Sequence, residues 1–237
     1  MTPAERIFVA IDMVDVNDAV FLAEKLKGRV GGFKIGKEFF TAQGPAGVRA
    51  ITALGVAVFL DLKFHDIPNT VAGAVRAALP LAPFMLNVHA SGGAQMMRAA
   101  VGEAAKFGPG RPMMLAVTVL TSLGEDDLSA TGVSGGTKAQ VRRLAALARD
   151  SGMDGVVCSP REIEALRADF GPGFKLVTPG IRPQGSVKDD QARVLTPADA
   201  VKIGADYLVI GRPITKALDP VEAVRRITDE IAQTTGS

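Results

Sequence analysis

The chain alternates short apolar runs with longer stretches of helical periodicity along its whole length. Several of the runs are apolar throughout, as in parallel strands that are covered on both faces. Because no linker-like change in composition separates them, the alternation predicts an α/β fold, a single (β/α)8 TIM barrel over residues 1–237. The eight runs that predict strands are residues 7–12, 32–36, 56–63, 84–90, 113–120, 155–159, 175–180 and 207–212.

Helical patterns with start and stop signals lie between the apolar runs. We expect a first helix that is capped by Asn17 and ends at Gly28, and a last helix capped by Asp219 with Pro220 at its first position. The alternative architecture is an open doubly wound sheet, whose dinucleotide-binding form carries Gly-x-Gly-x-x-Gly after the first strand. The segment AIDMVDVND at that place contains no glycine, which favours the barrel.

Composition limits the classes of partner. The chain has 237 residues and a formal net charge of +2, and no block of Lys and Arg stands out. With no Trp and one Tyr, a nucleic-acid surface is not expected, and a small-molecule partner fits better. The single cysteine, Cys158, excludes an intrachain disulfide and suits a reducing compartment. Because no run reaches the roughly 18 apolar residues of a membrane span and no signal-peptide core is present, we expect a cytoplasmic protein with no membrane partner.

Ionisable and polar residues recur at the carboxyl ends of these apolar runs. In a barrel, those ends all face the mouth that carries the active site. A single polar strand end is ordinary because strand ends meet solvent, but the recurrence at one pole indicates a functional site. The residues are Asp12, Lys34, Asp61, Lys63, Asn87, His89, Thr121, Ser122, Arg182 and Arg212.

The densest group of such residues is DLKFHDIPNT, residues 61–70. Asp61 and Lys63 are two positions apart, so a regular strand would direct both side chains to the same face. Lys34 on the neighbouring strand would extend the pair into an alternating Lys–Asp–Lys array. Carboxylates favour the charged form of a lysine, and a fixed ammonium can donate a proton and stabilise a developing anion. Schiff-base chemistry needs the neutral amine and fits this arrangement poorly.

Other residues of this region have a plain structural alternative. Asp66 lies beyond the strand, where periodicity cannot place it, and helix capping is the alternative role for Asn69 and Thr70. The only histidines, His65 and His89, form no HxH or HExxH pattern, so no metal site is expected. His89 fits a packing or hydrogen-bonding role at a strand end.

A second signal comes from the last two strand ends. Gly180 and Arg182 follow the seventh run, and Gly211 and Arg212 follow the eighth. In such barrels, these two loops often bind phosphate through backbone N–H groups, to which an arginine adds a bidentate clamp. The pattern therefore indicates a phosphate-binding side of the mouth.

Seven sequence blocks lie at or near these strand ends. They are AID (10–12), FKIGKEFF (33–40), DLKFHDIPNT (61–70), NVHASGG (87–93), VTVLTS (117–122), VTPGIRP (177–183) and VIGRPIT (209–215). In these blocks and their order, over nearly its whole length, the chain resembles the orotidine 5′-phosphate decarboxylases of the bacterial type. The Asp-x-Lys-x-x-Asp core alone is shared with related sugar-phosphate decarboxylases, but the Ile-Pro-Asn-Thr that follows it and the order of the other blocks make the resemblance specific.

The resemblance implies that orotidine 5′-monophosphate loses CO₂ to give UMP in de novo pyrimidine synthesis, with no metal and no organic cofactor. It implies that Lys63 donates a proton to C6 of the pyrimidine and that Asp61 lies near the leaving carboxylate. Lys34 and Asp12 would contact the ribose and complete the charge array.

The resemblance also implies a homodimer with shared active sites. Asp66 and Thr70 would reach into the active site of the partner subunit. Thr121 would meet the base, and the phosphate would be held by Arg182, Gly211 and Arg212. A glutamine after the seventh strand should bridge phosphate and base, and Gln191 matches the bacterial pattern better than Gln184.

Two alternative functions remain open at this point. A metal-dependent sugar-phosphate decarboxylase or aldolase of the same barrel type would use Asp61 and Asp66 with Mg²⁺ on an enediolate. A non-catalytic barrel would bind UMP-like nucleotides without turnover, which the intact Lys/Asp array disfavours.

Overall fold

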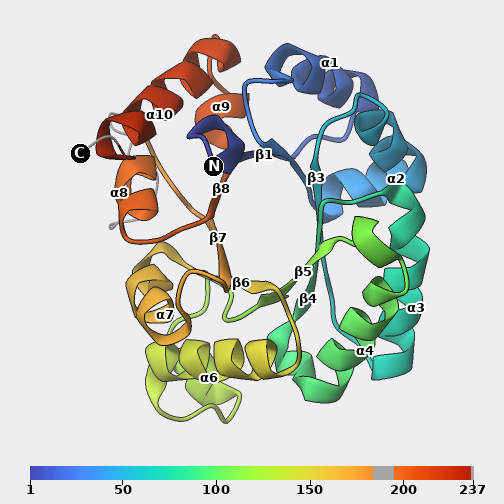
Figure 1. Cartoon of the computed structure of the whole chain (residues 1–237), viewed down its shortest axis with the longest axis vertical. Coiled ribbons are helices and arrows are strands. Elements are labelled where there is room, and N and C mark those ends of the chain that lie inside the picture. Colours follow the sequence, from blue (N-terminus) through green and yellow to red (C-terminus); the bar gives the residue numbers. More distant parts are fainter. Residues whose placement is uncertain (184–194, 236–237) are drawn as a thin grey trace.

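The computed structural model describes residues 1–183 and 195–235 and shows a closed barrel of eight parallel strands (Figure 1). Each strand pairs with the next one in the sequence, and β8 pairs with β1 to close the barrel. The predicted (β/α)8 fold is therefore confirmed. The strands are β1 (Ile7–Ile11), β2 (Gly32–Ile35), β3 (Val58–Phe64), β4 (Met85–His89), β5 (Met113–Val117), β6 (Gly155–Val157), β7 (Lys175–Pro179) and β8 (Tyr207–Ile210).

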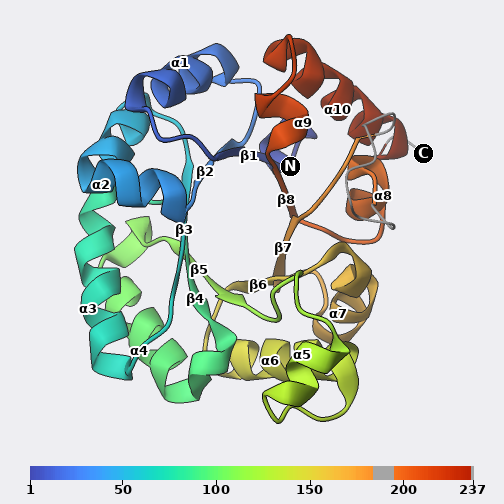
Figure 2. The ribbon, with the colours of Figure 1, turned by 180° about the vertical axis from the view of Figure 1, so that it is seen from behind.

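Helices form a ring outside the strands, as both views show (Figure 1, Figure 2). Two helices follow β5 and two follow β8. In the part of the chain that is described, no helix has the length and apolar character needed to cross a membrane. The helices are α1 (Val16–Leu26), α2 (Lys37–Thr52), α3 (Pro68–Ala78), α4 (Gly93–Ala105), α5 (Glu125–Ala130), α6 (Gly136–Asp150), α7 (Ile163–Phe170), α8 (Pro197–Lys202), α9 (Arg212–Thr215) and α10 (Pro220–Thr235).

The strands are apolar on both faces because each face packs against a separate core. Along β1, Phe8 and Ala10 belong to the cluster inside the barrel, where Phe8 lies edge to face against Tyr207 at 5.5 Å between ring centroids. Val9 and Ile11 belong to the larger cluster between the strands and the helices. This period of two explains why β1 is buried at every position, as the continuous apolar run predicts.

The helix starts follow the predicted chemistry only in part. Asp219 caps α10 as expected, because its Oδ1 accepts a hydrogen bond from the N–H of Val221 at 2.9 Å. The expectation that Asn17 caps α1 is wrong. Asp15 is the cap, and it accepts hydrogen bonds from the N–H groups of Asn17 and Asp18.

Neither Asn69 nor Thr70 caps α3. That helix begins at Pro68 after Ile67, and no side chain caps it. Pro68 has no N–H to satisfy, so the first turn of α3 needs less capping than most. The capping alternative for Asn69 and Thr70 is therefore wrong.

Candidate active site

A cavity of about 330 Å³ opens at the carboxyl ends of the strands. Its volume is at the lower end of the range for small-molecule sites. Apolar side chains such as Phe59, Val117 and Val209 line part of it. Most of the residues that were predicted for the site also line this cavity, namely Asp12, Lys34, Asp61, Lys63, Thr121, Arg182, Gly211 and Arg212.

Four charged side chains of this cavity alternate in sign. Asp12 Oδ1 lies 2.9 Å from Lys34 Nζ, and Lys34 Nζ lies 3.8 Å from Asp61 Oδ2. Asp61 Oδ1 in turn lies 2.6 Å from Lys63 Nζ. The side chains of Lys34 and Asp61 are each 11% exposed, and that of Lys63 is 24% exposed. Because charges that are buried to this degree are costly unless paired, the array holds two ammonium groups in fixed positions at the cavity.

Gly36, directly after β2, leaves room for the ammonium group of Lys34. A Cβ at this position would lie 2.7 Å from Lys34 Nζ and 3.6 Å from Asp12 Oδ1. A side chain here would therefore push Lys34 out of its contact with Asp12. The sequence around Gly36 carries no signal of this role, because nothing local indicates that the lysine two residues earlier lies against it.

Lys63 reaches Asp61 through an irregular backbone. Its φ of +54° lies in the left-handed region, which costs a residue other than glycine of order 1–3 kcal/mol. The pairing of β3 with β4 changes register between Leu60 and Phe64. Asp61 and Lys63 do share the cavity as expected, but the predicted cause, a regular strand pleat, is wrong. A bulge re-aims the lysine.

Asn87 of β4 contacts both members of this pair. It is fully buried, its Oδ1 accepts a hydrogen bond from the Lys63 N–H at 2.8 Å, and its Nδ2 donates to Asp61 Oδ1 at 2.6 Å. Sequence reasoning placed Asn87 among the polar strand ends and assigned it no role. The sequence does contain one signal for Asn87, an amide inside an apolar run. A buried amide needs hydrogen-bond partners, so its position indicates a structural or functional contact.

The loops after β7 and β8 bring two arginines to the cavity. Gly180 has a φ of +79°, a turn that favours glycine, and it leads from β7 to Arg182. Gly211 follows β8 directly, and Arg212 is the first residue of α9. Two guanidinium groups on this side of the mouth suit an anionic group of a ligand.

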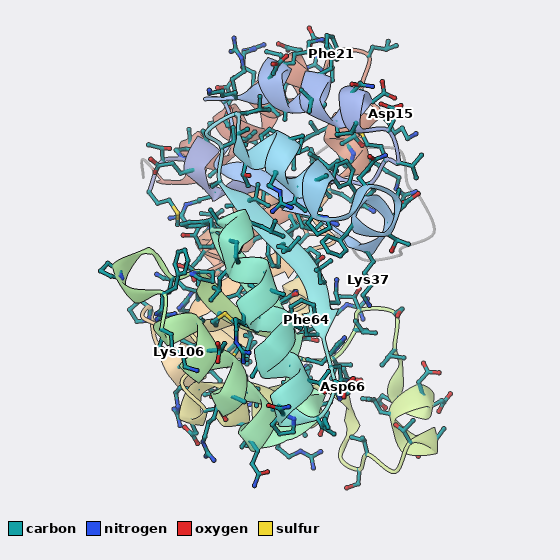
Figure 3. The ribbon with its side chains drawn as sticks, turned by 90° about the vertical axis from the view of Figure 1, so that its right-hand side faces the viewer. Asp15, Phe21, Lys37, Phe64, Asp66 and Lys106 are labelled. Atoms are coloured by element: carbon teal, nitrogen blue, oxygen red, sulfur yellow. The ribbon has the colours of Figure 1, made fainter. Side chains whose placement is uncertain are left out.

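Asp66 and Thr70 do not line the cavity of their own chain. Asp66 lies in the loop between Phe64 and α3, where it is exposed, and its Oδ1 accepts a hydrogen bond from the N–H of Ile67 (Figure 3). Thr70 is exposed in the first turn of α3. Their predicted place in a partner's site stays a prediction. Gln184 and Gln191 lie outside the described residues.

His89 ends β4, and its ring centroid lies 5.5 Å from that of His65. Its pKa is lowered to about 4, chiefly by burial. The positive charges of His65, Lys37 and Lys63 lower this pKa as well, against a smaller opposing effect of Asp61. His89 is therefore neutral at neutral pH, in keeping with a packing role.

We expect His89 to make the protein less stable as the pH falls from about 6.5 to about 4. In this window the unfolded chain binds a proton at His89 and the folded chain does not, so protonation favours unfolding. His89→Gln should remove this dependence. Urea unfolding should be measured at several pH values between about 6.5 and about 4. As the pH falls, the free energy of unfolding should decrease more for the wild type than for the variant. A difference that stays constant with pH would contradict the assignment.

Cys158 lines the cavity but does not have the properties of a nucleophile. Burial raises the pKa of its thiol to about 12, with a further contribution from the charge of Glu162. The thiol therefore stays protonated near neutral pH, and only a thiolate is an effective nucleophile.

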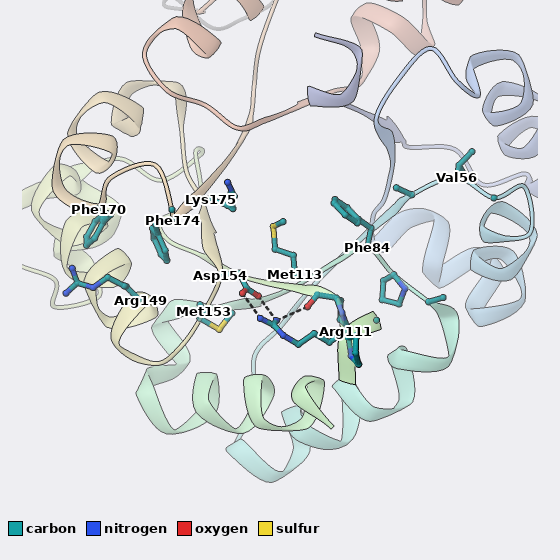
Figure 4. Close-up of a pocket in the computed structure, with 18 residues that line it drawn as sticks. Val56, Phe84, Arg111, Met113, Arg149, Met153, Asp154, Phe170, Phe174 and Lys175 are labelled. Carbon is teal, nitrogen blue, oxygen red and sulfur yellow. Dashed lines mark hydrogen bonds and ion pairs between the residues drawn. The ribbon is translucent and has the colours of Figure 1, made fainter. Parts of the chain in front are cut away.

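A wider cavity of about 1130 Å³ lies at the opposite end of the barrel, near the starts of β4, β5 and β7. Its charged groups are paired: the two terminal nitrogens of Arg111 each lie 2.7 Å from an oxygen of Asp154 (Figure 4). Lys175 Nζ lies 3.6 Å from Asp206 Oδ1. None of the predicted site residues that the structure describes lies in this cavity. Since barrels carry their active sites at the carboxyl-terminal face, the smaller cavity is the candidate.

Within one chain, the two carboxylates that a metal-dependent alternative would use, Asp61 and Asp66, do not line the same cavity. Asp61 lines the cavity and Asp66 is exposed outside it. Within residues 1–183 and 195–235, no three side chains of His, Cys, Asp or Glu gather in a group that could hold a metal ion. The described residues of one chain therefore contain no site with three or more protein ligands for a metal ion.

Comparison with known proteins gives consistent matches over nearly the whole chain. The model of the orotidine 5′-phosphate decarboxylase / HUMPS family matches residues 5–227. The orotidine 5′-phosphate decarboxylase of Rhodospirillum rubrum is 59% identical over 230 residues, which cover 95% of this chain and 93% of that protein. The one from Paramagnetospirillum magneticum is 56% identical over 229 residues, with coverage of 95% and 97%. The crystal structure of the orotidine 5′-phosphate decarboxylase from Lactobacillus acidophilus has a TM-score of 0.85 at 37% identity, covering 95% of this chain and 98% of that one.

Proposed function

Because the chain belongs to the orotidine 5′-phosphate decarboxylase / HUMPS family, we propose that it converts orotidine 5′-monophosphate to UMP and CO₂ through a lysine ammonium, without a cofactor. The names of its close relatives support this activity, which is a step of pyrimidine biosynthesis. The observation that carries the mechanism is the array of alternating charge at the barrel mouth, formed by Asp12, Lys34, Asp61 and Lys63, in which Lys34 and Asp61 are buried.

The proposed reaction breaks the bond between C6 of the pyrimidine and its carboxylate carbon, and the electron pair stays on C6. No adjacent carbonyl delocalises this pair, so a fixed positive charge near C6 is the available stabiliser. Lys63 supplies that charge, transfers a proton from Nζ to C6, and regains a proton from water. The leaving carboxylate would lie beside Asp61, where like charge raises its free energy before CO₂ departs.

The remaining cavity residues bind the rest of the nucleotide in this proposal. Lys34 and Asp12 contact the ribose, and Thr121 meets the base. Arg182, Gly211 and Arg212 hold the phosphate, with Gln191, or Gln184 as second choice, bridging phosphate and base. Because the phosphate is remote from C6, its binding energy can be used to orient the reacting atoms.

We further propose a homodimer in which Asp66 and Thr70 enter the site of the partner. Both are exposed and outside the cavity of their own chain. The adjacent Ile67 is 67% exposed, and an apolar side chain of this size beside them is suited to burial in a subunit interface. A cytoplasmic location and the absence of nucleic-acid and membrane partners stay predictions from the sequence.

Product identification tests the proposed function. Purified protein incubated with orotidine 5′-monophosphate should form UMP and CO₂ in equal amounts, measured by chromatography and by CO₂ release. Binding of UMP without any turnover would contradict it and would favour the non-catalytic barrel.

Arg212→Ala should weaken binding of the phosphate. Loss of a hydrogen bond to a charged group costs about 1.5–3 kcal/mol, so KM for orotidine 5′-monophosphate and Kd for UMP should rise by about 10- to 150-fold. Turnover of orotidine, which lacks the phosphate, should change little. Arg142→Ala, which removes an exposed ion pair with Asp169, is the control. Equal losses with orotidine and with its phosphate would show that Arg212 does not act on the phosphate.

A further inference from the structure

The backbone at Lys63 must be held in place by its surroundings. Its φ of +54° is a left-handed conformation, and such strain persists only where the neighbouring structure determines it. The strand pairing shows where the irregularity lies. Leu60 pairs with Leu86 and Phe64 pairs with Val88, so three residues of β3 lie opposite one residue of β4. That one residue is Asn87.

The side chain of Asn87 replaces the strand pairing that the bulge removes. Its Oδ1 accepts a hydrogen bond from the Lys63 N–H at 2.8 Å, in place of a backbone carbonyl of a regular ladder. A buried N–H without such an acceptor would be costly, so this bond favours the bulged backbone. Asn87 therefore fixes the point from which the Lys63 side chain enters the cavity.

The amide nitrogen of Asn87 holds the carboxylate of Asp61 in position. Asn87 Nδ2 donates to Asp61 Oδ1 at 2.6 Å, and this oxygen also accepts from Lys63 Nζ at 2.6 Å. The opposite orientation of the amide would place its NH₂ against the Lys63 N–H and its oxygen against a carboxylate. One side chain thus sets the position of both groups relative to each other.

Asn87 does not touch the cavity itself. It is absent from the residues that line the cavity, and it is fully buried. We propose that Asn87 is a positioning residue for the decarboxylation, which holds Asp61 and the strained backbone of Lys63 in register with the substrate. This inference rests on the proposed function, because it concerns the same lysine.

Asn87→Leu tests the inference, because leucine has a similar size and offers no hydrogen bond. A displacement of the reacting group by about 1 Å can cost roughly 100-fold in rate, so kcat should fall by about that factor. Kd for UMP should change by less than about threefold, because the phosphate and ribose contacts remain. A crystal structure of the variant should show Lys63 with a negative φ. Thr178→Val is the matched control, because it removes a fully buried hydroxyl from β7 and leaves the array untouched.

Asn87→Ala is the second variant if Asn87→Leu does not fold. A kcat within about threefold of the wild type in either folded variant would overturn the inference, and so would equal losses in kcat and in UMP affinity. Failure of both variants to fold would overturn it as well, since Asn87 would then act on the fold. All of these outcomes concern the variants alone and are compatible with a wild type that forms UMP. A wild type that forms no UMP would refute the proposed function instead.

Discussion

Replacing Lys63 with alanine should abolish UMP formation while the barrel stays folded. The variant loses both the proton donor and the cation nearest Asp61, whose Oδ1 lies 2.6 Å from Lys63 Nζ. A general acid contributes about 10²–10⁴-fold and an electrostatic stabiliser about 10²–10³-fold, so kcat should fall by at least about 10⁴-fold. Asp61 keeps its hydrogen bond to Asn87 and its contact with Lys34, which supports a folded variant. The measurement is the initial rate of absorbance loss with orotidine 5′-monophosphate, together with circular dichroism.

Lys106→Ala is the matched control for this substitution. Lys106 lies on the surface, where it pairs with Glu103, so its loss should leave kcat unchanged. A folded Lys63→Ala protein with the full rate of the wild type would refute the role of Lys63 in the reaction.

Mixing two inactive variants should restore activity if the active site is shared between subunits. In a shared site, Lys63→Ala would damage the site of its own chain, whereas Asp66→Asn would damage the site of the partner. A hybrid dimer would therefore contain one intact site, and an equimolar mixture with random exchange should reach roughly a quarter of wild-type activity. The measurement is the decarboxylation rate of the mixture after subunit exchange, which differently tagged chains can report.

The control for this experiment is a mixture of Lys63→Ala with Asp61→Asn. Both of these side chains line the cavity of one chain, so every site of their hybrid lacks one of them and no recovery is expected. Absence of recovery with Asp66→Asn after confirmed exchange would place Asp66 outside the partner's site. Recovery in both mixtures would indicate that activity returns for another reason.

The barrel and the mouth of the barrel could be predicted from local pattern. Eight apolar runs alternate with helices, and strand ends such as Asp12 and Lys34 carry charge where apolar residues precede them. The carboxyl ends of parallel strands lie at one face of the barrel, so the position of a residue along its strand is enough to predict that it lies at the mouth. The array of Asp12, Lys34, Asp61 and Lys63 follows from that rule.

The conformation of Lys63 could not be predicted in this way. A positive φ at a lysine has no local sequence signal, since it depends on how β3 pairs with β4. The proposed role of Asn87 depends on the same pairing: the amide inside an apolar run signals that it has partners, and only the structure identifies them. Strand periodicity describes one strand, whereas a bulge is a property of two.

Local sequence pattern also leaves the helix cap and the surface residues undecided. Asp15 and Asn17 have similar preferences as helix caps, and only the backbone shows that the helix begins at Val16 after Asp15. Asp66 and Thr70 lie outside the cavity of their own chain, so no pattern within the chain indicates what they act on. For these two residues the resemblance to a family remains the basis of the prediction.

The rate of decarboxylation in the absence of metal ions tests the central claim most directly. The wild type should be treated with EDTA, and UMP formation from orotidine 5′-monophosphate followed by absorbance with and without added Mg²⁺. We expect the same rate in all conditions, because the Lys63 ammonium provides the positive charge that a metal would otherwise provide. Activity that is lost with EDTA and restored by Mg²⁺ would contradict the lysine mechanism and favour metal-dependent chemistry at this barrel mouth.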